Sequence, residues 1–314
     1  MFGKIRKKVR NRDAVVVTGL GGYSLTDTVE CGQAFAFEPV TEEEDYVEYI
    51  VPVGEMLVFV GQEKPGELIF FDVTDEDFEN TVVPYFSLGV DFGAIADKVA
   101  AGYKQDWFSE AVKNARGIAI LKQDAWETLF SFIVSQNNNI PRIKKILRRE
   151  RLEYGKNLAE KCGLLKCPLA RHGEAPSDET CRECGVCYSF PKAEDVKNAP
   201  QKLLCANPGF RYRYLVDAAT RVADGTTDLG SIEGVHSYAH SLEELKKIVG
   251  VGDKVASCVA LFGLGNLDAF PIDVWMKRAI DTYFDGKLDP TVFGEYAGVA
   301  QQYIFHYIRN IENK

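Results

Sequence analysis

The feature that most constrains the fold is a change of hydrophobic pattern near residue 90. Before it, short runs of β-branched and aromatic residues are separated by glycine or proline, which is typical of strands in an antiparallel sheet. These runs occupy residues 14–18, 46–53, 56–60 and 67–71. The Gly19-Leu-Gly-Gly22 segment lacks the Lys-Ser/Thr pair of a phosphate-binding loop, so we expect a turn there.

Beyond Phe92 the apolar residues recur at helical spacing. Residues 126–134 are apolar enough for a buried helix, and Pro141 stands where proline favours the start of another. Further helices are expected at 193–198, 212–224, 242–248, 253–262, 274–283 and 293–310. The pattern predicts an α+β chain with an antiparallel sheet domain over 1–95 and a mostly helical domain over 96–314, which carries a cysteine-rich insertion at about 160–188.

Composition narrows the class of protein. The 314 residues are 46% hydrophobic and 26% charged, without an apolar run long enough to cross a membrane. No apolar segment follows the basic residues of 1–10, so we expect no signal peptide and a cytoplasmic protein, nucleoid-associated if prokaryotic. The net charge of −9 argues against nucleic-acid binding only as an average over the whole surface. Acidic residues are concentrated in 41–46 and 72–78, whereas 142–149 is basic. By default, such charge runs are solvated faces.

Residues 244–258 have the pattern of a helix, a tight Gly250-Val-Gly252 turn and a second helix. Lys254 falls in the first turn of the second helix, where the helix dipole disfavours a cation and favours a free amine. Asp273 follows Pro271 and occupies an expected helix N-cap. Either residue alone would be a surface lysine or a capping aspartate. Together they suggest a nucleophile with a supporting carboxylate.

This combination resembles the helix-hairpin-helix (HhH-GPD) DNA glycosylases, in which the hairpin precedes a catalytic aspartate and a lysine at position 254 marks the bifunctional members. Further segments resemble the 8-oxoguanine DNA glycosylase family in particular. Residues 135–143 contain its Asn-Asn-Asn-Ile-x-Arg-Ile motif, and 30–35 resemble its Gly-Gln-x-Phe strand. Residues 209–214 are similar to its Gly-Tyr-Arg-x-Arg-Tyr loop, with Phe210 in place of the usual tyrosine, and 296–305 are similar to its C-terminal helix. The matches run in order from about residue 25 to 305. The resemblance implies a TBP-like sheet domain before the HhH-GPD domain.

The resemblance also implies an activity, the excision of 8-oxoguanine opposite cytosine from duplex DNA in base excision repair. An enzyme that acts on a base extrudes it from the stack. Lys254 would then attack the anomeric carbon and form a Schiff base, and β-elimination would nick the strand. Asp273 would stabilise the positive charge that develops on the sugar. We expect no catalytic cofactor, damaged double-stranded DNA as the partner, no membrane and a monomer.

Base recognition is implied for Gly32, Cys258, Gln301 and Phe305. The carbonyl of Gly32 would accept the N7 hydrogen that distinguishes 8-oxoguanine from guanine. Gln301 would bind the hydrogen-bonding edge of the base, Phe305 would stack on it, and Cys258, four residues after Lys254, would form the opposite wall. Taken singly, these would be a bulge glycine, a helix-surface glutamine and core side chains.

DNA contacts are implied for Asn137, Arg142, Phe210, Arg211, Gly250 and Gly252. The asparagine would fill the gap left by the extruded base, the phenylalanine would act as a wedge, and the two arginines would hold the estranged cytosine. The turn glycines would donate backbone N–H groups to a phosphate. Trp275 stands where many eukaryotic members have histidine, so a phosphate contact at that position is not carried over.

The cysteine cluster is not explained by the resemblance. Five of the eight cysteines fall at positions 162, 167, 181, 184 and 187. Cys167, Cys181, Cys184 and Cys187 could hold a structural zinc ion, with Cys162 or His172 as a substitute ligand. The spacing of the last three is also compatible with an iron–sulfur cluster, and the segment could hold no metal.

Three rival interpretations stay open. The first is a glycosylase of the same fold with another lesion specificity, although the four recognition residues favour an oxidised purine. The second is a catalytically inactive, metal-stapled DNA-binding module. The third is a protein-interaction scaffold, suggested by the acidic N-terminal half, which leaves Lys254 and Asp273 unexplained.

Overall fold

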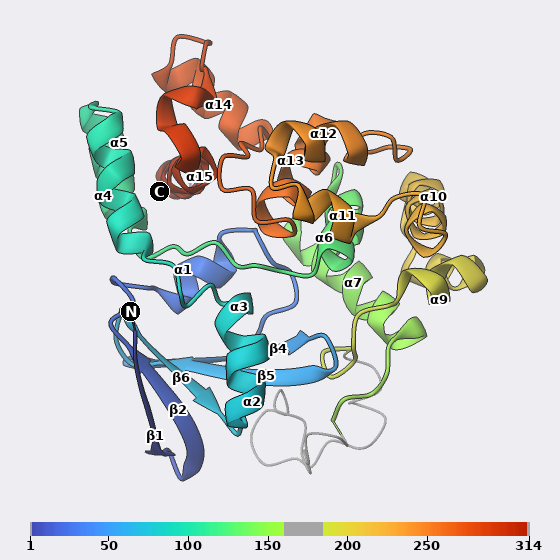
Figure 1. Cartoon of the computed structure of the whole chain (residues 1–314), viewed down its shortest axis with the longest axis horizontal. Helices are drawn as coiled ribbons and strands as arrows, with labels where there is room; N and C mark the ends of the chain where they lie inside the picture. The colour runs from blue at the N-terminus through green and yellow to red at the C-terminus, as the bar shows by residue number, and fades with distance from the viewer. Residues whose placement is uncertain (1, 160–184, 313–314) are drawn as a thin grey trace.

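The computed structural model describes residues 2–159 and 185–312. A six-stranded sheet occupies the N-terminal part and helices dominate the remainder, so the predicted α+β class is confirmed (Figure 1). The predicted boundary at residue 95 lies inside helix α4 (Phe92–Gly102). Within the described residues, no helix is long and apolar enough to cross a membrane.

The sheet is antiparallel throughout, with strand order β1-β2-β6-β5-β4-β3. Its strands are β1 (Gly3–Val9), β2 (Arg12–Thr18), β3 (Glu38–Glu43), β4 (Tyr46–Val53), β5 (Met56–Gln62) and β6 (Glu67–Phe71). The four predicted strands are confirmed, and Gly21 and Gly22 form the expected turn. The two edge strands, β1 and β3, were not predicted because they are rich in charged residues and, apart from buried Glu38, their residues are partly or fully exposed.

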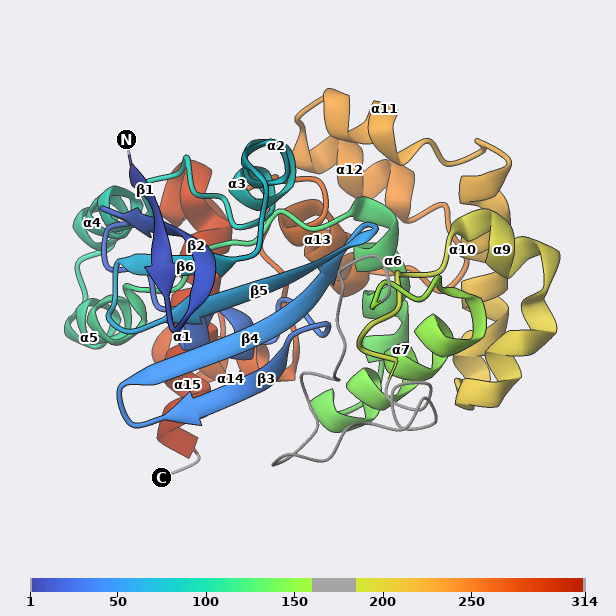
Figure 2. The same cartoon turned by 90° about the horizontal axis from the view of Figure 1, so that it is seen from below.

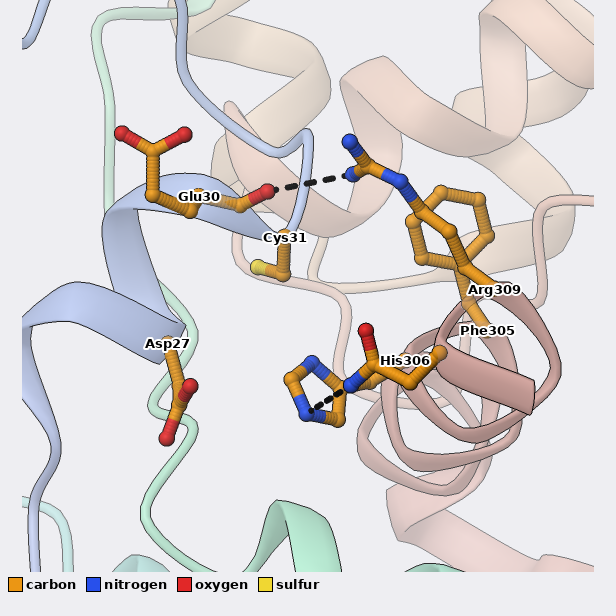
Figure 3. Close-up of a pocket in the computed structure, with 7 residues that line it drawn as sticks. Asp27, Glu30, Cys31, Phe305, His306 and Arg309 are labelled. Carbon is orange, nitrogen blue, oxygen red and sulfur yellow. Dashed lines mark hydrogen bonds between the residues drawn. The ribbon is translucent and has the colours of Figure 1, made fainter. Parts of the chain in front are cut away.

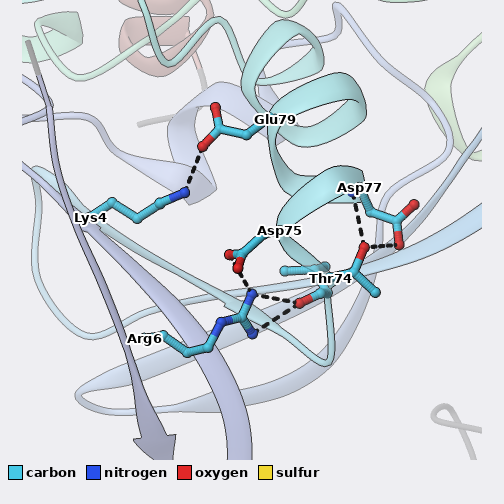
Figure 4. Close-up of polar contacts among 7 residues, drawn as sticks. Lys4, Arg6, Thr74, Asp75, Asp77 and Glu79 are labelled. Carbon is cyan, nitrogen blue, oxygen red and sulfur yellow. Dashed lines mark hydrogen bonds and ion pairs between the residues drawn. The ribbon is translucent and has the colours of Figure 1, made fainter.

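Strand β1 is stabilised by polar contacts with the segment that follows β6 (Figure 4). That segment forms α2 (Asp75–Asp77), η1 (Phe78–Val82) and α3 (Val83–Tyr85). The Lys4 amine lies 2.6 Å from Glu79, and the Arg6 guanidinium donates to Asp75 at 2.9 Å and to the Val73 carbonyl at 3.1 Å. The basic N-terminal run therefore forms an edge strand, and two of its basic side chains form ion pairs with acidic residues of the helical segment that follows β6.

The helices lie mostly on one side of the sheet, with α4 and α5 at one end and α7, α9 and α10 at the other (Figure 2). Besides α4 they are α1 (Leu25–Glu30), α5 (Asp106–Ala115), α6 (Ala125–Ser135), α7 (Ile140–Tyr154), α9 (Ala193–Asn198), η2 (Pro200–Ala206), η3 (Gly209–Arg211), α10 (Tyr212–Ala223), α11 (Leu229–Gly234), α12 (Tyr238–Leu245), α13 (Asp253–Phe262), α14 (Val274–Tyr283), η4 (Pro290–Tyr296) and α15 (Ala297–Glu312). Alternate sheet residues such as Val15 and Phe70 enter the core shared with these helices. Val16 and Phe71 face the opposite side, where Leu158, Val186 and Cys187 cover them.

Helix ends follow local capping. The predicted ranges of α9, α13 and α14 are confirmed. Helix α12 begins earlier than expected because the Ser237 side chain accepts from His240 N and caps it. Helix α15 begins at Ala297 rather than at residue 293, because Gly294 has φ +62° and interrupts the helix. Pro141 lies in the first turn of α7, as expected, behind the Asn139 cap.

Candidate active site

A cavity of about 730 Å³ brings together segments that are far apart in the sequence. Five of the predicted site residues line it: Gly32, Asn137, Lys254, Asp273 and Phe305. They come from the segment after α1, the loop between α6 and α7, the start of α13, the start of α14, and α15. The two residues predicted to perform the chemistry thus share one hollow with two of those predicted to recognise the base.

Lys254 lies half-buried in the first turn of α13, after the N-cap residue Gly252. Its amine donates to the Ser135 hydroxyl oxygen at 3.3 Å and lies 4.6 Å from the centre of the Phe132 ring. Ser135 donates its own proton to the Phe132 carbonyl at 2.8 Å, so its oxygen is left to accept from the amine. The lysine is therefore held in a defined place.

Asp273 is the N-cap of α14, as the sequence predicts. Its Oδ1 atom accepts from Met276 N at 2.9 Å, which fixes the half-buried side chain in the cavity wall. Capping and a catalytic role are compatible, because the cap occupies only part of a carboxylate that has several acceptor positions.

Cys258 is buried one turn after Lys254 and does not line the cavity. Burial raises the pKa of its thiol, the Asp273 carboxylate raises the pKa further, and the Lys254 amine lowers it. The thiol is thus a buried group near the start of α13 that the cavity does not expose. Gln301 is also buried outside the lining, with its side-chain oxygen accepting from Gln302 at 2.7 Å.

The expected strand at residues 30–35 is wrong. Helix α1 ends at Glu30, and the residues that follow form an irregular segment without ladder pairing. Gly32 has φ +82°, a left-handed conformation that favours glycine, and a methyl group added there would lie 3.8 Å from Phe305 Cε1. The segment thus places Gly32 beside the aromatic ring of Phe305 in the cavity lining.

The loop between α6 and α7 is fastened by Arg211. This arginine is only 4% exposed and donates to three backbone carbonyls, those of Gln136, Asn137 and Pro208. Burial lowers the pKa of the guanidinium, and the charge of nearby Arg142 lowers it further. Arg142 itself is exposed, as is Asn137, whose φ of +48° is unusual for a residue other than glycine.

The turn between α12 and α13 lies against α10 and the Asn137 loop. Gly250 has φ +82°, and a methyl group there would lie 2.4 Å from Tyr214 Cγ, so only glycine fits. Its carbonyl accepts from the Gln136 side chain at 3.0 Å. Phe210 is 49% exposed and packs edge-on against the Tyr214 ring at 5.9 Å between centroids. The turn, Phe210 and the Asn137 loop therefore form a connected surface beside the cavity.

Ser135 and Phe132 were not predicted as site residues. They are three positions apart on α6 and so share a face, which could have identified them as a pair. Nothing in their spacing indicates that α13 would bring Lys254 to them.

The predicted metal ligands Cys167, Cys181 and Cys184, with Cys162 and His172, lie outside the described residues. Cys187 is buried against the far face of the sheet, and its carbonyl accepts from Leu158 N at 2.7 Å. Across residues 2–159 and 185–312, no group of three or more His, Cys, Asp or Glu side chains could hold a metal ion. The metal site stays a prediction.

The chain is similar to known proteins in both sequence and fold. Residues 17–129 match the family described as 8-oxoguanine DNA glycosylase, N-terminal domain. The structure of MBOgg1 in complex with a low-affinity DNA ligand is 33% identical, covers 99% of each chain and superposes with a TM-score of 0.80. The chain belongs to the 8-oxoguanine DNA glycosylase family.

Other members extend this similarity. An 8-oxoguanine glycosylase/lyase of Clostridium acetobutylicum, bound to double-stranded DNA with cytosine opposite 8-oxoguanine, is 29% identical over 99% of this chain and 98% of that one, with a TM-score of 0.79. The N-glycosylase/DNA lyase of Saccharomyces cerevisiae is 28% identical over 81% of this chain. The chain spans 66% of that yeast protein and 60% of its Arabidopsis thaliana counterpart.

Proposed function

We propose that this protein is a bifunctional DNA glycosylase/AP lyase that excises 8-oxoguanine opposite cytosine from duplex DNA. The observation that carries the proposal is the convergence of Lys254, Asp273, Gly32 and Phe305 on one cavity. The names of the yeast and clostridial family members support the same activity. Damaged double-stranded DNA is the proposed partner, and base excision repair the proposed process.

The cavity suits an extruded base. Its volume of about 730 Å³ lies in the range of small-molecule sites. Phe305 offers a ring for stacking, and Gly32 offers a backbone carbonyl to the N7 hydrogen of 8-oxoguanine, where guanine has a lone pair. Cys258 supports the opposite wall from behind, and Gln301, one turn before Phe305, is the proposed contact for the base edge. Extrusion of the base would place its sugar near Lys254.

The chemistry follows from the two groups at the cavity. The lone pair of the Lys254 amine forms a bond to C1′ of the sugar while the bond from C1′ to the base breaks, and that electron pair leaves with the base. The Asp273 carboxylate stabilises the positive charge on the sugar as it develops. The adduct then loses a proton from its nitrogen, the bond from C1′ to the ring oxygen O4′ breaks as a C1′–N double bond forms, and O4′ takes up a proton, which gives a protonated Schiff base. Its positive charge permits loss of a C2′ proton, and the 3′ phosphate then leaves, which cuts the strand. No catalytic cofactor takes part in this scheme.

The surface beside the cavity suits the distorted duplex. Phe210 is exposed enough to act as a wedge. Asn137 is also exposed, and its backbone carbonyl accepts a hydrogen bond from Arg211, which holds the loop in place. Arg142 is placed to donate to the estranged cytosine. Most N–H groups of Arg211 are bonded to backbone, so we assign it first to holding the Asn137 loop and second to the cytosine. Gly250 and Gly252 are the proposed phosphate contacts.

The metal proposal is separate from the catalytic scheme. Thiolates of Cys167, Cys181, Cys184 and Cys187 would hold structural zinc, with an iron–sulfur cluster as the alternative. Metal analysis of the purified protein distinguishes these two, and its absorption spectrum reports an iron–sulfur cluster independently.

The test of function is a comparison of duplex substrates under single-turnover conditions. We expect base release and strand cleavage with 8-oxoguanine opposite cytosine, slower release opposite adenine, and none from undamaged DNA. Faster release of 3-methyladenine or thymine glycol would favour the first rival, a glycosylase of other specificity. Tight binding without release of any base would favour the inactive DNA-binding module.

A further inference from the structure

A second, smaller cavity lies between the end of α1 and helix α15 (Figure 3). It has a volume of about 270 Å³ and is lined by Asp27, Glu30, Cys31, His306 and Asn310, together with Phe305 and Arg309. Phe305 and Arg309 also line the larger cavity that contains Lys254. These two side chains of α15 therefore form a partition between the two hollows.

Arg309 connects this partition to the end of α1. It lies four residues after Phe305 on α15, so the two side chains share one face of the helix. Its Nη1 atom donates to the Glu30 carbonyl at 3.2 Å, a contact between residues 279 positions apart (Figure 3). Glu30 is the last residue of α1, and the carbonyls of a final helical turn have no partner within the helix. The arginine supplies such a partner.

The chain beyond Gly32 is anchored independently. The Gln33 side chain is 0% exposed and donates to the carbonyls of Thr28 at 2.9 Å and Ala119 at 2.8 Å. Its oxygen accepts from Leu121 N at 2.8 Å. Gln33 thus joins the chain after Gly32 both to α1, through Thr28, and to the segment before α6, through Ala119 and Leu121. The Arg309 contact adds a link from the end of α1 to α15, the helix that carries Phe305.

We infer that Arg309 is a positioning residue for base recognition. By joining α15 to the Glu30 carbonyl, it sets the position of the Gly32 carbonyl relative to the Phe305 ring, two groups that would both contact the oxidised base. This role rests on the proposed function. It requires no contact between Arg309 and the reacting atoms, and none between Arg309 and Lys254.

Two activities that share Lys254 should respond differently to the loss of Arg309. Release of 8-oxoguanine requires both the recognition pair and Lys254, whereas Schiff-base formation at a preformed abasic site requires Lys254 without a base. Loss of Arg309 should therefore impair the first activity and spare the second. A general disturbance of α15 would impair both.

The experiment compares Arg309→Met, Arg309→Lys and the wild-type protein. Single-turnover release is measured on a duplex with 8-oxoguanine opposite cytosine, and borohydride trapping on a duplex with a preformed abasic site. We expect Arg309→Met to release the base about tenfold more slowly, the scale of one charged hydrogen bond. Its trapping should stay within about twofold of wild type, and Arg309→Lys, which retains a donor, should recover part of the release rate.

A matched control is Arg116→Met, because the Arg116 ion pair with Asp97 lies outside the lining of both cavities. It should equal wild type in both assays. Equal loss of both activities in Arg309→Met would overturn the positioning role, and so would unchanged base release. A wild-type protein that traps on abasic DNA but releases no 8-oxoguanine would instead contradict the proposed function, and the role of Arg309 with it.

Discussion

The Lys254 amine lies 3.3 Å from the Ser135 hydroxyl oxygen, which joins the start of α13 to the end of α6. The serine proton is committed to the Phe132 carbonyl, so the hydroxyl acts as an acceptor. A flexible lysine side chain has several rotamers, and a single hydrogen bond at its tip selects among them. The proposed nucleophile is thereby held at the cavity wall before any substrate enters.

Removal of this acceptor should slow the chemistry without weakening DNA binding. We expect Ser135→Ala to lower the rate of borohydride trapping on an abasic duplex by about threefold to tenfold, the scale of one hydrogen bond. Ser135→Thr keeps the hydroxyl and should retain most of the rate. The measurement is trapping at saturating DNA, with the dissociation constant determined in parallel. Equal rates for wild type and Ser135→Ala would contradict this role for the serine.

Substitutions of the two arginines near the Asn137 loop, Arg142 and Arg211, should have different effects on the free energy of unfolding and on the preference for cytosine. Arg142 is exposed, so Arg142→Ala should change the free energy of unfolding by less than about 0.5 kcal/mol while reducing the preference for cytosine opposite the lesion. Arg211→Lys cannot reproduce the bonds to three backbone carbonyls and should lose about 1–3 kcal/mol of stability. Urea unfolding and the cytosine-to-adenine ratio of base release measure both effects. An Arg211→Lys protein as stable as wild type would argue against the fastening role.

The two glycines of the turn, Gly250 and Gly252, differ in backbone conformation, so that alanine substitutions at the two positions test the effect of backbone strain on stability. Gly250→Ala would place a methyl group 2.4 Å from Tyr214 at φ +82°, so we expect a loss of about 1–3 kcal/mol or more in urea unfolding. Gly252 has φ −100° and no neighbour within 4 Å of an added methyl group, so Gly252→Ala should cost about 1 kcal/mol or less, from weaker capping. Similar losses in both variants would show that the left-handed conformation and the contact with Tyr214 do not decide the choice of glycine.

A buried carboxyl on α7 should make stability depend on pH. Glu150 is 0% exposed, and within the described residues its two oxygens have no hydrogen-bond partner. Burial, followed by the charge of Glu153, raises the pKa of Glu150 to about 9. The folded state therefore keeps the proton over a range in which the unfolded chain is ionised. The protonated Glu150 side chain therefore contributes fully to the free energy of unfolding below the ordinary pKa of glutamate. This contribution is lost as pH rises towards 9.

Glu150→Gln removes this titration and keeps the shape of the side chain. We expect the variant to gain stability over wild type as pH rises, so that its advantage at pH 8 exceeds its advantage at pH 5.5 by about 3 kcal/mol. Urea unfolding at the two pH values measures the difference, with Glu110→Gln, an exposed position on α5, as the control. A constant difference at both pH values would mean that Glu150 does not change its ionisation on folding.

The helical part of the fold was predictable because local signals define its ends. Asp273 caps α14 and Pro141 lies in the first turn of α7, as their residue types suggest. Strands β1 and β3 were not predictable in the same way, since their stability comes from pairing with β2 and β4 rather than from apolar side chains. The irregular segment at Gly32 depends on contacts of Gln33 with Ala119 and of Glu30 with Arg309, partners that are distant in sequence.

The site was predictable only in part from spacing. Helical periodicity places Cys258 near Lys254, and the pKa of the Cys258 thiol does respond to that amine, but periodicity could not show that the thiol lies behind the cavity surface. The convergence of Lys254 with Asp273 and Gly32 was expected from family resemblance, because no local rule brings such distant segments together. The contact of Ser135 with Lys254 and that of Arg309 with Glu30 required the folded structure.

The most direct test of the account is covalent trapping. A duplex with 8-oxoguanine opposite cytosine is incubated with sodium borohydride and either the wild-type protein or Lys254→Gln, and the adduct is mapped by peptide mass spectrometry. The account predicts a DNA adduct on Lys254 in the wild type and none in the variant. An adduct on another residue, or one that persists in Lys254→Gln, would contradict the assignment of the nucleophile. Absence of both adduct and base release would contradict the proposed activity itself.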